Sequence, residues 1–266
     1  EAKIVRDLWL DKLGKKPERT LEEAFTKWAE EELPNLNHEA KNHAWHLLPY
    51  VKGFKVVDAP AVAARYVKAN KKLAASTLRN RLSILKRSCN LAFKKWDWLD
   101  QPIADKIAMP SVNNERRVFL TYDEVLSLLI AADTKYMEDA ILLAVYTGMR
   151  LSEILRITVR DGLLYLQTSK NGDPRVVPMH PALFDTRIPL SVAESTIQAG
   201  FRRTRDKAGL HHIHFHDLRH TTASWLVQRG VPLYSVGTLL GHRSVKTTQR
   251  YAHLATEHLR EVVGKL

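Results

Sequence analysis

The chain has 266 residues, enough for one large domain or two ordinary ones, and 45% of them are hydrophobic, so a core can form. No apolar run approaches the roughly 18 residues of a membrane span, and the single cysteine, Cys89, excludes a disulfide framework and points to a reducing, cytoplasmic compartment. The chain has 41 lysine and arginine residues against 29 aspartate and glutamate residues, a net charge of +12. This excess favours a polyanionic partner, and a nucleic acid is a better candidate than a membrane surface.

The first hundred residues are typical of four helices. Thr20 and Glu23 form a capping box before a helix that extends to about residue 33. Further helices are predicted from Asn37 to about 51, over 59–70, and from a cap at Ser76 onward. The last of these helices has an apolar stripe at three- and four-residue steps, made of Leu78, Leu82, Leu85, Cys89, Ala92 and Trp96.

This fourth helix also has a basic side. Residues 71–95 contain basic side chains and no acidic ones, whereas residues 18–32 are rich in glutamate. An ordinary solvated face is the alternative to a nucleic-acid surface for such a charge run. The residues outside the apolar stripe that we interpret as DNA contacts are Arg79, Arg81, Lys86, Arg87 and Lys94.

A domain boundary is predicted after these helices. Residues 100–118 hold two prolines and little periodicity, which is typical of a linker. We therefore expect an N-terminal remnant or linker over 1–17, a helical domain over 18–105, a linker over 106–118, and a second domain with a C-terminal tail over 119–266.

The second domain is predicted to mix helices with a small sheet. Thr121 and Glu124 form another capping box before a helix to about 132, and helices follow over 138–146 and from Leu151. Residues 157–179 have strand chemistry around two tight-turn dipeptides, 161–162 and 171–172, and helices return after 191. The expected fold class is mainly α (α+β), with two helical lobes and a three-stranded antiparallel sheet in the second.

Four segments of the second domain carry residues suited to chemistry: TGMRLSEIL (147–155), TSKNGDPR (168–175), HFHDLRHTT (214–222) and LGHRSVKTTQRYAH (240–253). Each is weak alone. Together, in this order, residues 115–260 resemble the tyrosine recombinase family, also called the phage-integrase-type site-specific recombinases. The first lobe is similar in layout to the core-DNA-binding domain of that family, whereas residues 1–17 are too short for the arm-binding domain of its larger members.

The resemblance implies a role for each matching residue. Tyr251 matches the nucleophile, and Glu153 matches the acidic residue that supports the first arginine. The catalytic set that it implies is Arg150, Lys170, His216, Arg219, His242 and Tyr251.

The chemistry of these residue types suits the same roles. A guanidinium offers a planar fork for two phosphate oxygens, a tyrosine with an ordinary pKa near 10 needs activation, and a lysine can give a proton to a departing 5′ oxygen. Histidine can move a proton near neutral pH.

The resemblance also implies the reaction and its partners. The enzyme would cleave and rejoin DNA through a 3′-phosphotyrosine intermediate, with no ATP, metal or other cofactor. It would bind double-stranded DNA at an inverted-repeat core site as a homotetramer, exchange strands through a Holliday junction, and act away from membranes. Accessory DNA-bending proteins are a further class of partner.

Several alternatives stay open at this point. A DNA-binding protein without chemistry and a type IB-like topoisomerase are the other functions considered. Five histidines between 211 and 220 invite a zinc site, but no thiol and no H-E-x-x-H motif accompanies them, so we expect no metal. Arg202 and Arg203 are interpreted as DNA-backbone contacts, with a solvated helix as the alternative.

Overall fold

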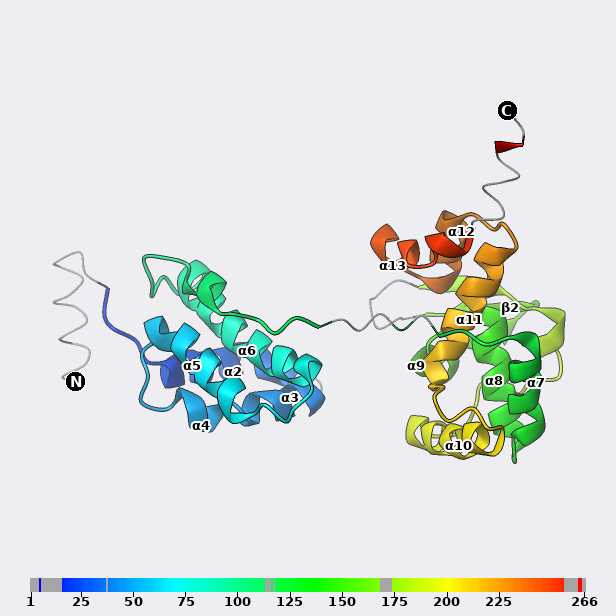
Figure 1. Ribbon diagram of the computed structural model, residues 1–266, viewed down its shortest axis with the longest axis horizontal. Coiled ribbons are helices and arrows are strands. Elements are labelled where there is room, and N and C mark those ends of the chain that lie inside the picture. Colours follow the sequence, from blue (N-terminus) through cyan, green and yellow to red (C-terminus); the bar gives the residue numbers. More distant parts are fainter. Residues whose placement is uncertain are drawn as a thin grey trace. The chain divides into compact units, whose positions relative to one another are not determined.

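The computed structural model describes residues 5, 16–36, 38–112, 116, 118–167, 174–255 and 263–264. The chain forms two compact units, Glu1–Glu115 and Arg116–Leu266 (Figure 1). Lys170, the predicted turn at 171–172 and most of the C-terminal tail lie outside the described residues.

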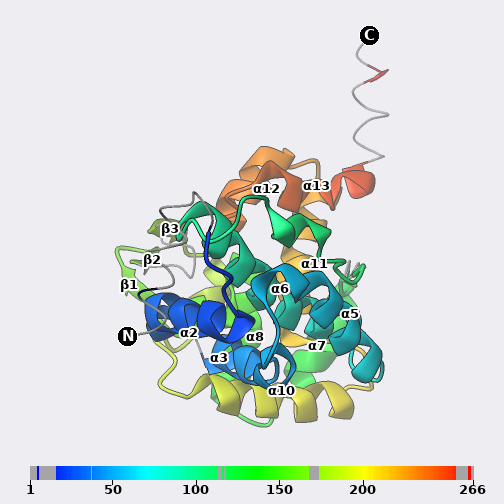
Figure 2. The same ribbon diagram turned by 90° about the vertical axis from the view of Figure 1, so that its left-hand side faces the viewer.

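The regular elements among the described residues of the first unit are all helices, joined by turns and one isolated β-bridge between Thr20 and Lys55 (Figure 2). Its core contains Trp28, Tyr66, Leu82 and Leu85, together with Cys89, which is fully buried as expected of a core residue. Burial raises the pKa of the Cys89 thiol to about 12, so this thiol is inert at neutral pH. The α-helices are α2 (Leu21–Glu32), α3 (His38–Trp45), α4 (Leu48–Val51), α5 (Ala59–Ala69) and α6 (Ala75–Lys94).

Two predictions for the first unit need correction. The helix expected over 37–51 is interrupted between α3 and α4, because Pro49 cannot donate a backbone hydrogen bond to Trp45 and its ring would meet that carbonyl. Helix α6 begins at Ala75 with Ala74 as its N-cap, so Ser76 lies inside the first turn rather than at the cap. The capping box of Thr20 and Glu23 is confirmed.

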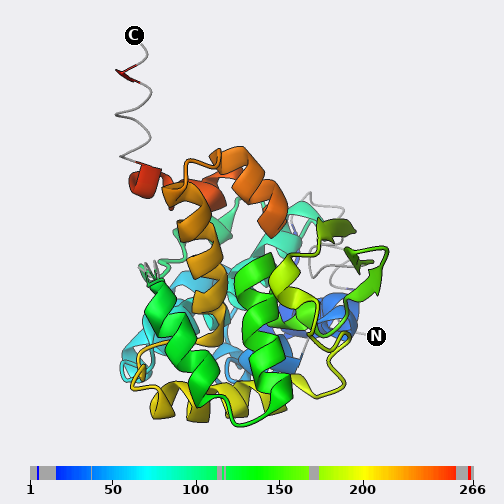
Figure 3. The same cartoon turned by 90° about the vertical axis from the view of Figure 1, so that its right-hand side faces the viewer.

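The second unit packs helices around a larger core and carries the sheet at one side. Helices α8 and α11 lie side by side through its middle, and α10 crosses one end (Figure 3). The order of elements is α7 (Tyr122–Ala131), α8 (Lys135–Thr147), α9 (Leu151–Ile154), β1 (Thr158–Arg160), β2 (Leu163–Leu166), β3 (Arg175–Pro178), α10 (Glu194–Lys207), α11 (Phe215–Gln228), α12 (Leu233–Leu240) and α13 (Val245–Gln249).

The sheet is antiparallel in the order β1-β2-β3, which confirms the three-stranded prediction. Asp161 and Gly162 both have positive φ and form the tight turn between β1 and β2. Leu164 pairs with Val177 on the buried face, and the alternation of the strands places Arg175, opposite Leu166, on that same face. An arginine therefore occupies a position where an apolar residue would be expected.

The mainly α fold class with its small sheet is confirmed. Among the described residues, no helix combines the length and the apolar character needed to span a bilayer.

Candidate active site

A buried carboxylate organises the centre of the second unit. Glu153 lies in the short helix α9 and has no exposed surface. Its Oε1 accepts a hydrogen bond from Arg150 Nη1 at 2.7 Å, and its Oε2 accepts from the Arg150 backbone N–H at 3.0 Å and from Arg175 Nη2 at 2.8 Å. Burial opposes the charged carboxylate, but these donors and the positive charges prevail and hold the pKa of Glu153 below its ordinary value.

The second predicted arginine reaches the same carboxylate from α11. Arg219 Nη1 lies 4.0 Å from Glu153 Oε2 and donates to the Gly148 carbonyl at 2.7 Å, while Arg219 Nη2 donates to the Leu240 carbonyl at 2.8 Å. Gly148 ends α8 in a left-handed conformation, and a Cβ there would lie 2.4 Å from Leu240 Cδ2, so only glycine permits this approach. Residues far apart in sequence are thus held around one carboxylate.

The arginine cluster carries more positive than negative charge. Arg150, Arg175 and Arg219 surround Glu153, with no other carboxylate among the described residues within salt-bridge distance of the three guanidiniums. Burial and the neighbouring Arg150 lower the pKa of Arg219 to about 9, which still leaves it charged at pH 7. A buried cationic excess of this kind is suited to binding an anion such as a phosphate.

Three histidines border the arginines. Burial, together with nearby positive charge, lowers the pKa of all three histidines. The pKa of His216 lies below its ordinary value, and those of His220 and His242 are lowered to about 4. All three are therefore neutral at pH 7. The His216 and His220 rings meet edge to face with centroids 5.0 Å apart, and His242 Nδ1 lies 2.8 Å from Thr248 Oγ1.

Tyr251 lies beside the second of these histidines. It follows α13, is buried against Val227, Val236 and Leu240, and its hydroxyl forms a hydrogen bond with His220 Nδ1. Burial raises the pKa of Tyr251, while Arg250 and Arg219 act in the opposite direction. His220 is one helical turn beyond His216 on α11, so its bond with the hydroxyl places Tyr251 beside the histidines, where the charge of Arg219 acts on the pKa of Tyr251.

Two residues of this cluster, Arg175 and His220, were not predicted as site residues from the sequence. Arg175 joins Glu153 from β3, and His220 bonds the Tyr251 hydroxyl. The sequence alone does not identify Arg175, because its inward direction depends on the pairing of β2 with β3. His220 has no distinctive pattern either, since it is one of five histidines between 211 and 220. Lys170 lies outside the described residues, so its position in the site stays a prediction.

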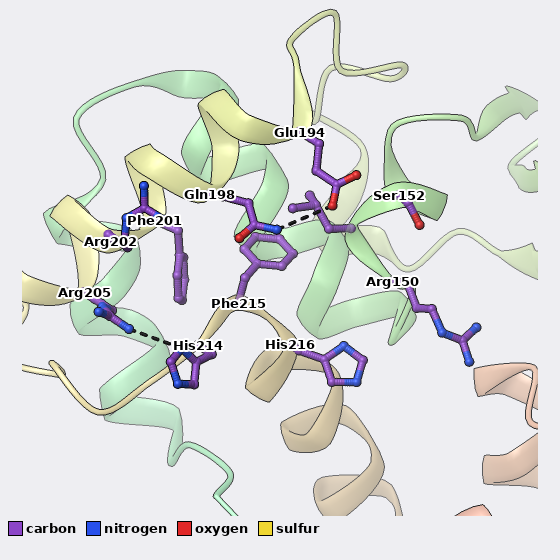
Figure 4. Close-up of a pocket in the computed structure, with 11 residues that line it drawn as sticks. Arg150, Ser152, Glu194, Gln198, Phe201, Arg202, Arg205, His214, Phe215 and His216 are labelled. Carbon is purple, nitrogen blue, oxygen red and sulfur yellow. Dashed lines mark hydrogen bonds between the residues drawn. The ribbon is translucent and has the colours of Figure 1, made fainter. Parts of the chain in front are cut away.

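A groove of about 460 Å³ lies against the site (Figure 4). Arg150 and His216 stand at one side of it, and α10 forms the other wall with Gln198 and Arg202. Arg205, also on α10, donates to the Ile213 carbonyl and approaches His214. The groove thus joins the arginine cluster to a basic helix.

The first turn of α11 is fixed from the start of the second unit. Asp217 is buried, and its carboxylate accepts hydrogen bonds from Arg116 Nε at 3.0 Å, from Arg116 Nη2 at 2.6 Å and from the His214 backbone N–H at 2.8 Å. Arg116 Nη2 also donates to the His212 carbonyl at 2.8 Å. This bidentate pair orients the helix that carries His216, Arg219 and His220.

The described residues contain no group of three or more His, Cys, Asp or Glu side chains arranged to hold a metal ion. The functional groups that the described site brings together are guanidiniums, imidazoles and a phenol.

Comparisons with known proteins agree with this geometry. Residues 180–258, which include His216, Arg219, His242 and Tyr251, match the model of the phage integrase family. The tyrosine recombinase XerA of Pyrococcus horikoshii is 28% identical over 67% of this chain and 73% of its own length. The integrase of Salmonella phage P22 is 25% identical over 97% of this chain and 83% of its own length. Together these matches support placing the chain among the tyrosine recombinases.

The fold of the recombinase is that of known integrases. A lambda integrase tetramer bound to a Holliday junction superposes with a TM-score of 0.65 at 20% identity, covering 85% of this chain and 78% of the integrase. The family match and the tyrosine recombinase relatives support site-specific DNA recombination as the activity class.

The predicted basic residues of the recombinase do not form one surface. Arg79, Lys86, Arg87 and Lys94 recur at seven- and eight-residue steps, so they share one face of α6, whereas Arg81 points elsewhere and donates to the Tyr66 hydroxyl at 2.8 Å. Acidic partners oppose part of the shared face, because Arg87 pairs with Glu32 at 2.5 Å and Lys86 with Asp105 at 3.5 Å.

The neutral histidines predict how the stability of the recombinase depends on pH. A histidine whose folded pKa is depressed binds its proton more readily in the unfolded chain, so acidification favours unfolding. The effect begins below the ordinary pKa of 6.5 and is complete near pH 4, the folded pKa of His220 and His242. From pH 7 to pH 5 we expect the free energy of unfolding, measured in urea, to fall by about 2 kcal/mol for each histidine and by about 4 kcal/mol for the pair.

The control for this titration is a set of glutamine variants. His220→Gln together with His242→Gln should flatten the pH dependence, while His212→Gln, at an exposed site, should retain it. An equal slope in the double variant and the unaltered chain would contradict the assignment.

Proposed function

We propose that the recombinase cleaves one DNA strand by attack of the Tyr251 phenolic oxygen on a phosphodiester clamped by Arg150 and Arg219. The observation that carries this proposal is the convergence of both arginines on Glu153, with His216 and Tyr251 beside them. Arg150 and Arg219 each use only part of their five N–H donors on Glu153 and the carbonyls, which leaves donors for phosphate oxygens.

The proposed step balances without a cofactor. The Tyr251 oxygen forms a bond to phosphorus, the bond from phosphorus to the 5′ oxygen breaks, and a 3′-phosphotyrosine ester remains. The phenolic proton leaves the tyrosine, and the departing 5′ oxygen receives a proton, for which Lys170 is the proposed donor. Attack of a 5′ hydroxyl on the ester reverses the step, so the bond energy is retained and neither ATP nor metal is required.

The histidines supply the proton transfer at the nucleophile. Neutral His220, with Nδ1 against the Tyr251 hydroxyl, is placed to accept the phenolic proton. Neutral His216 and His242 are placed to donate hydrogen bonds to phosphate oxygens, because each lies near the arginines whose charge lowers its pKa. The arginines stabilise the charge that develops on the phosphoryl group.

The DNA partner follows from the same proposal. The groove between Arg150 and α10 continues the phosphate site along a duplex, and the basic face of α6 supplies further backbone contacts. The fold that this chain shares with the lambda integrase tetramer on a Holliday junction supports the proposal that four copies exchange strands at an inverted-repeat core site.

A covalent-trapping experiment tests the proposal. Sheared genomic DNA from the source organism is incubated with the protein, denatured in SDS, and the DNA joined to protein is sequenced to find the core site. A synthetic duplex of that site with a nick beside the cleavage position should then accumulate an adduct, because the nicked strand loses the 5′ end needed for rejoining. Peptide mass spectrometry should place the nucleotide on Tyr251.

The other functions are outcomes of the same experiment. The absence of any adduct would favour a DNA-binding protein without chemistry and would overturn the proposal, as would an adduct on another residue. Relaxation of supercoiled plasmid that lacks the core site, by protein at a concentration where it is monomeric, would favour a type IB-like topoisomerase.

Two neighbouring arginines of α10 give a matched prediction for DNA binding. Arg202 lines the groove with Arg150, whereas Arg203 faces the other way, near Tyr136 and Asp133. Arg202→Ala should therefore weaken binding to the core duplex and lower the slope of log affinity against log salt by about 1, while Arg203→Ala should change neither. Fluorescence anisotropy at several salt concentrations measures both. Equal effects of the two variants would contradict the placement of the DNA in this groove.

A further inference from the structure

Arg175 has a position that the proposed chemistry does not explain. It is the first residue of β3 and points to the buried face of the sheet, where its side chain is only 13% exposed. Burial lowers the pKa of Arg175, because a buried site disfavours the charged form of the guanidinium. A buried guanidinium on an apolar sheet face needs a structural or chemical reason.

The contacts of Arg175 connect two parts of the site. On one side, Nη2 donates to Glu153 Oε2 at 2.8 Å. On the other side, the guanidinium lies against the backbone of Gly241, where an added Cβ would come within 2.2 Å of Nη1 and 3.3 Å of Cζ. Gly241 ends α12 with a φ of +68°. It lies between His242 and Leu240, and the Leu240 carbonyl accepts a hydrogen bond from Arg219.

We propose that Arg175 is a positioning residue, which fixes the Gly241–His242 turn against the Arg150–Arg219 pair through its contacts with Glu153 and Gly241. The inference rests on the proposed function, because the turn matters only if His242 and the arginines act on a phosphate. Arg175 itself is too buried to be a principal DNA contact, and it acts through the residues that it holds.

Two further observations support this role. Arg175 Nε is buried without a hydrogen-bond partner among the described residues, so the side chain is held by its terminal nitrogens rather than along its whole length. The charge of Arg175 also acts on His242, together with Arg219, Arg150 and His220, whereas His216 responds chiefly to Arg219 and Arg150. We therefore expect His242 to respond more strongly than His216 to the loss of the Arg175 charge.

Histidine titration by NMR tests the proposal without any DNA. With the histidine Cε1 carbons labelled, Arg175→Gln should move the titration of His242 from about 4 toward its ordinary value and leave that of His216 unchanged. Arg175→Lys retains the charge and should shift His242 less. A merely structural role would move both histidines or neither, and either result would overturn the proposal.

The rate of adduct formation on the nicked core duplex is the second measurement. We expect Arg175→Gln to slow single-turnover cleavage by about 10–100-fold, because a displacement of about 1 Å near the reacting groups has effects of this size. Binding of the duplex should stay within about threefold, and Arg175→Lys should recover part of the rate. A rate equal to that of the unaltered chain, or a loss confined to DNA binding, would overturn the inference.

Glycine variants test the turn from its other side. Gly241→Ala should slow cleavage as Arg175→Gln does, since its Cβ would collide with the guanidinium. Gly209→Ala is the matched control, because Gly209 has a similar φ of +74° and nothing within 4 Å of an added Cβ. The combined loss in Arg175→Gln with Gly241→Ala should be smaller than the product of the single losses, and independent effects would count against the proposed contact.

These outcomes are separable from failure of the proposed function. If the unaltered chain forms no adduct, the proposed chemistry fails, while the NMR titration still decides whether Arg175 controls His242. If the unaltered chain forms the adduct and both Arg175 variants behave like it, only the positioning role fails.

Discussion

Tyr251→Phe should abolish the covalent adduct with nicked core DNA, a loss of at least about 10³-fold in single-turnover cleavage. The phenolic oxygen is the only atom that the substitution removes, and without it no bond to phosphorus can form. DNA affinity should change little, because the Tyr251 side chain is buried and its hydroxyl is directed to His220 rather than to the groove. Gel analysis in SDS and anisotropy separate the two quantities.

The fold of the Tyr251→Phe variant should survive, so that the loss can be assigned to chemistry. The phenyl ring still fills the pocket formed by Val227, Val236 and Leu240, and the lost hydrogen bond to His220 should cost about 1 kcal/mol of unfolding free energy. Tyr234→Phe is the matched control, since Tyr234 is 80% exposed on α12. An adduct that persists in Tyr251→Phe and disappears in another tyrosine variant would show that the nucleophile lies elsewhere.

Local signals in the sequence predict the elements well where they act over a few residues. The capping box of Thr121 with Glu124 and the turn at Asp161–Gly162 depend on contacts within one turn of chain, and both occur as predicted. The same signals failed at Ser76, because a serine in the first turn of a helix resembles a serine at its cap.

The site was predicted only in part because its contacts join distant residues. The carbonyls that orient Arg219 belong to Gly148 and Leu240, and no spacing in the sequence links these three. Arg175 becomes recognisable only when the pairing of β2 with β3 places it opposite Leu166 and toward Glu153. Residue type and order can thus suggest the chemistry, while the packing of α8, α11 and α12 decides which side chains carry it.

Glu153→Gln should destabilise the second unit by about 3–5 kcal/mol, the usual consequence of removing one member of a buried charge cluster. The amide retains the shape of the side chain but leaves Arg150, Arg175 and Arg219 without their shared negative charge. Urea unfolding at pH 7 measures the loss. Glu138→Gln is the matched control, because its pair with Lys135 is solvent-exposed and should contribute under about 1 kcal/mol.

Acid and anions provide two independent checks of this interpretation. Since the pKa of Glu153 is depressed in the folded chain, its contribution to stability is present above its ordinary pKa of 4.5 and is lost as the pH falls through the lower, folded value. The Gln variant should lack this acid-induced loss. Sulfate should stabilise the variant more than the unaltered chain, because an anion that binds only the folded cluster raises the unfolding free energy by mass action. A variant that sulfate leaves unchanged would indicate that the guanidiniums separate when Glu153 is lost, and that the carboxylate assembles the phosphate clamp as well as neutralising it.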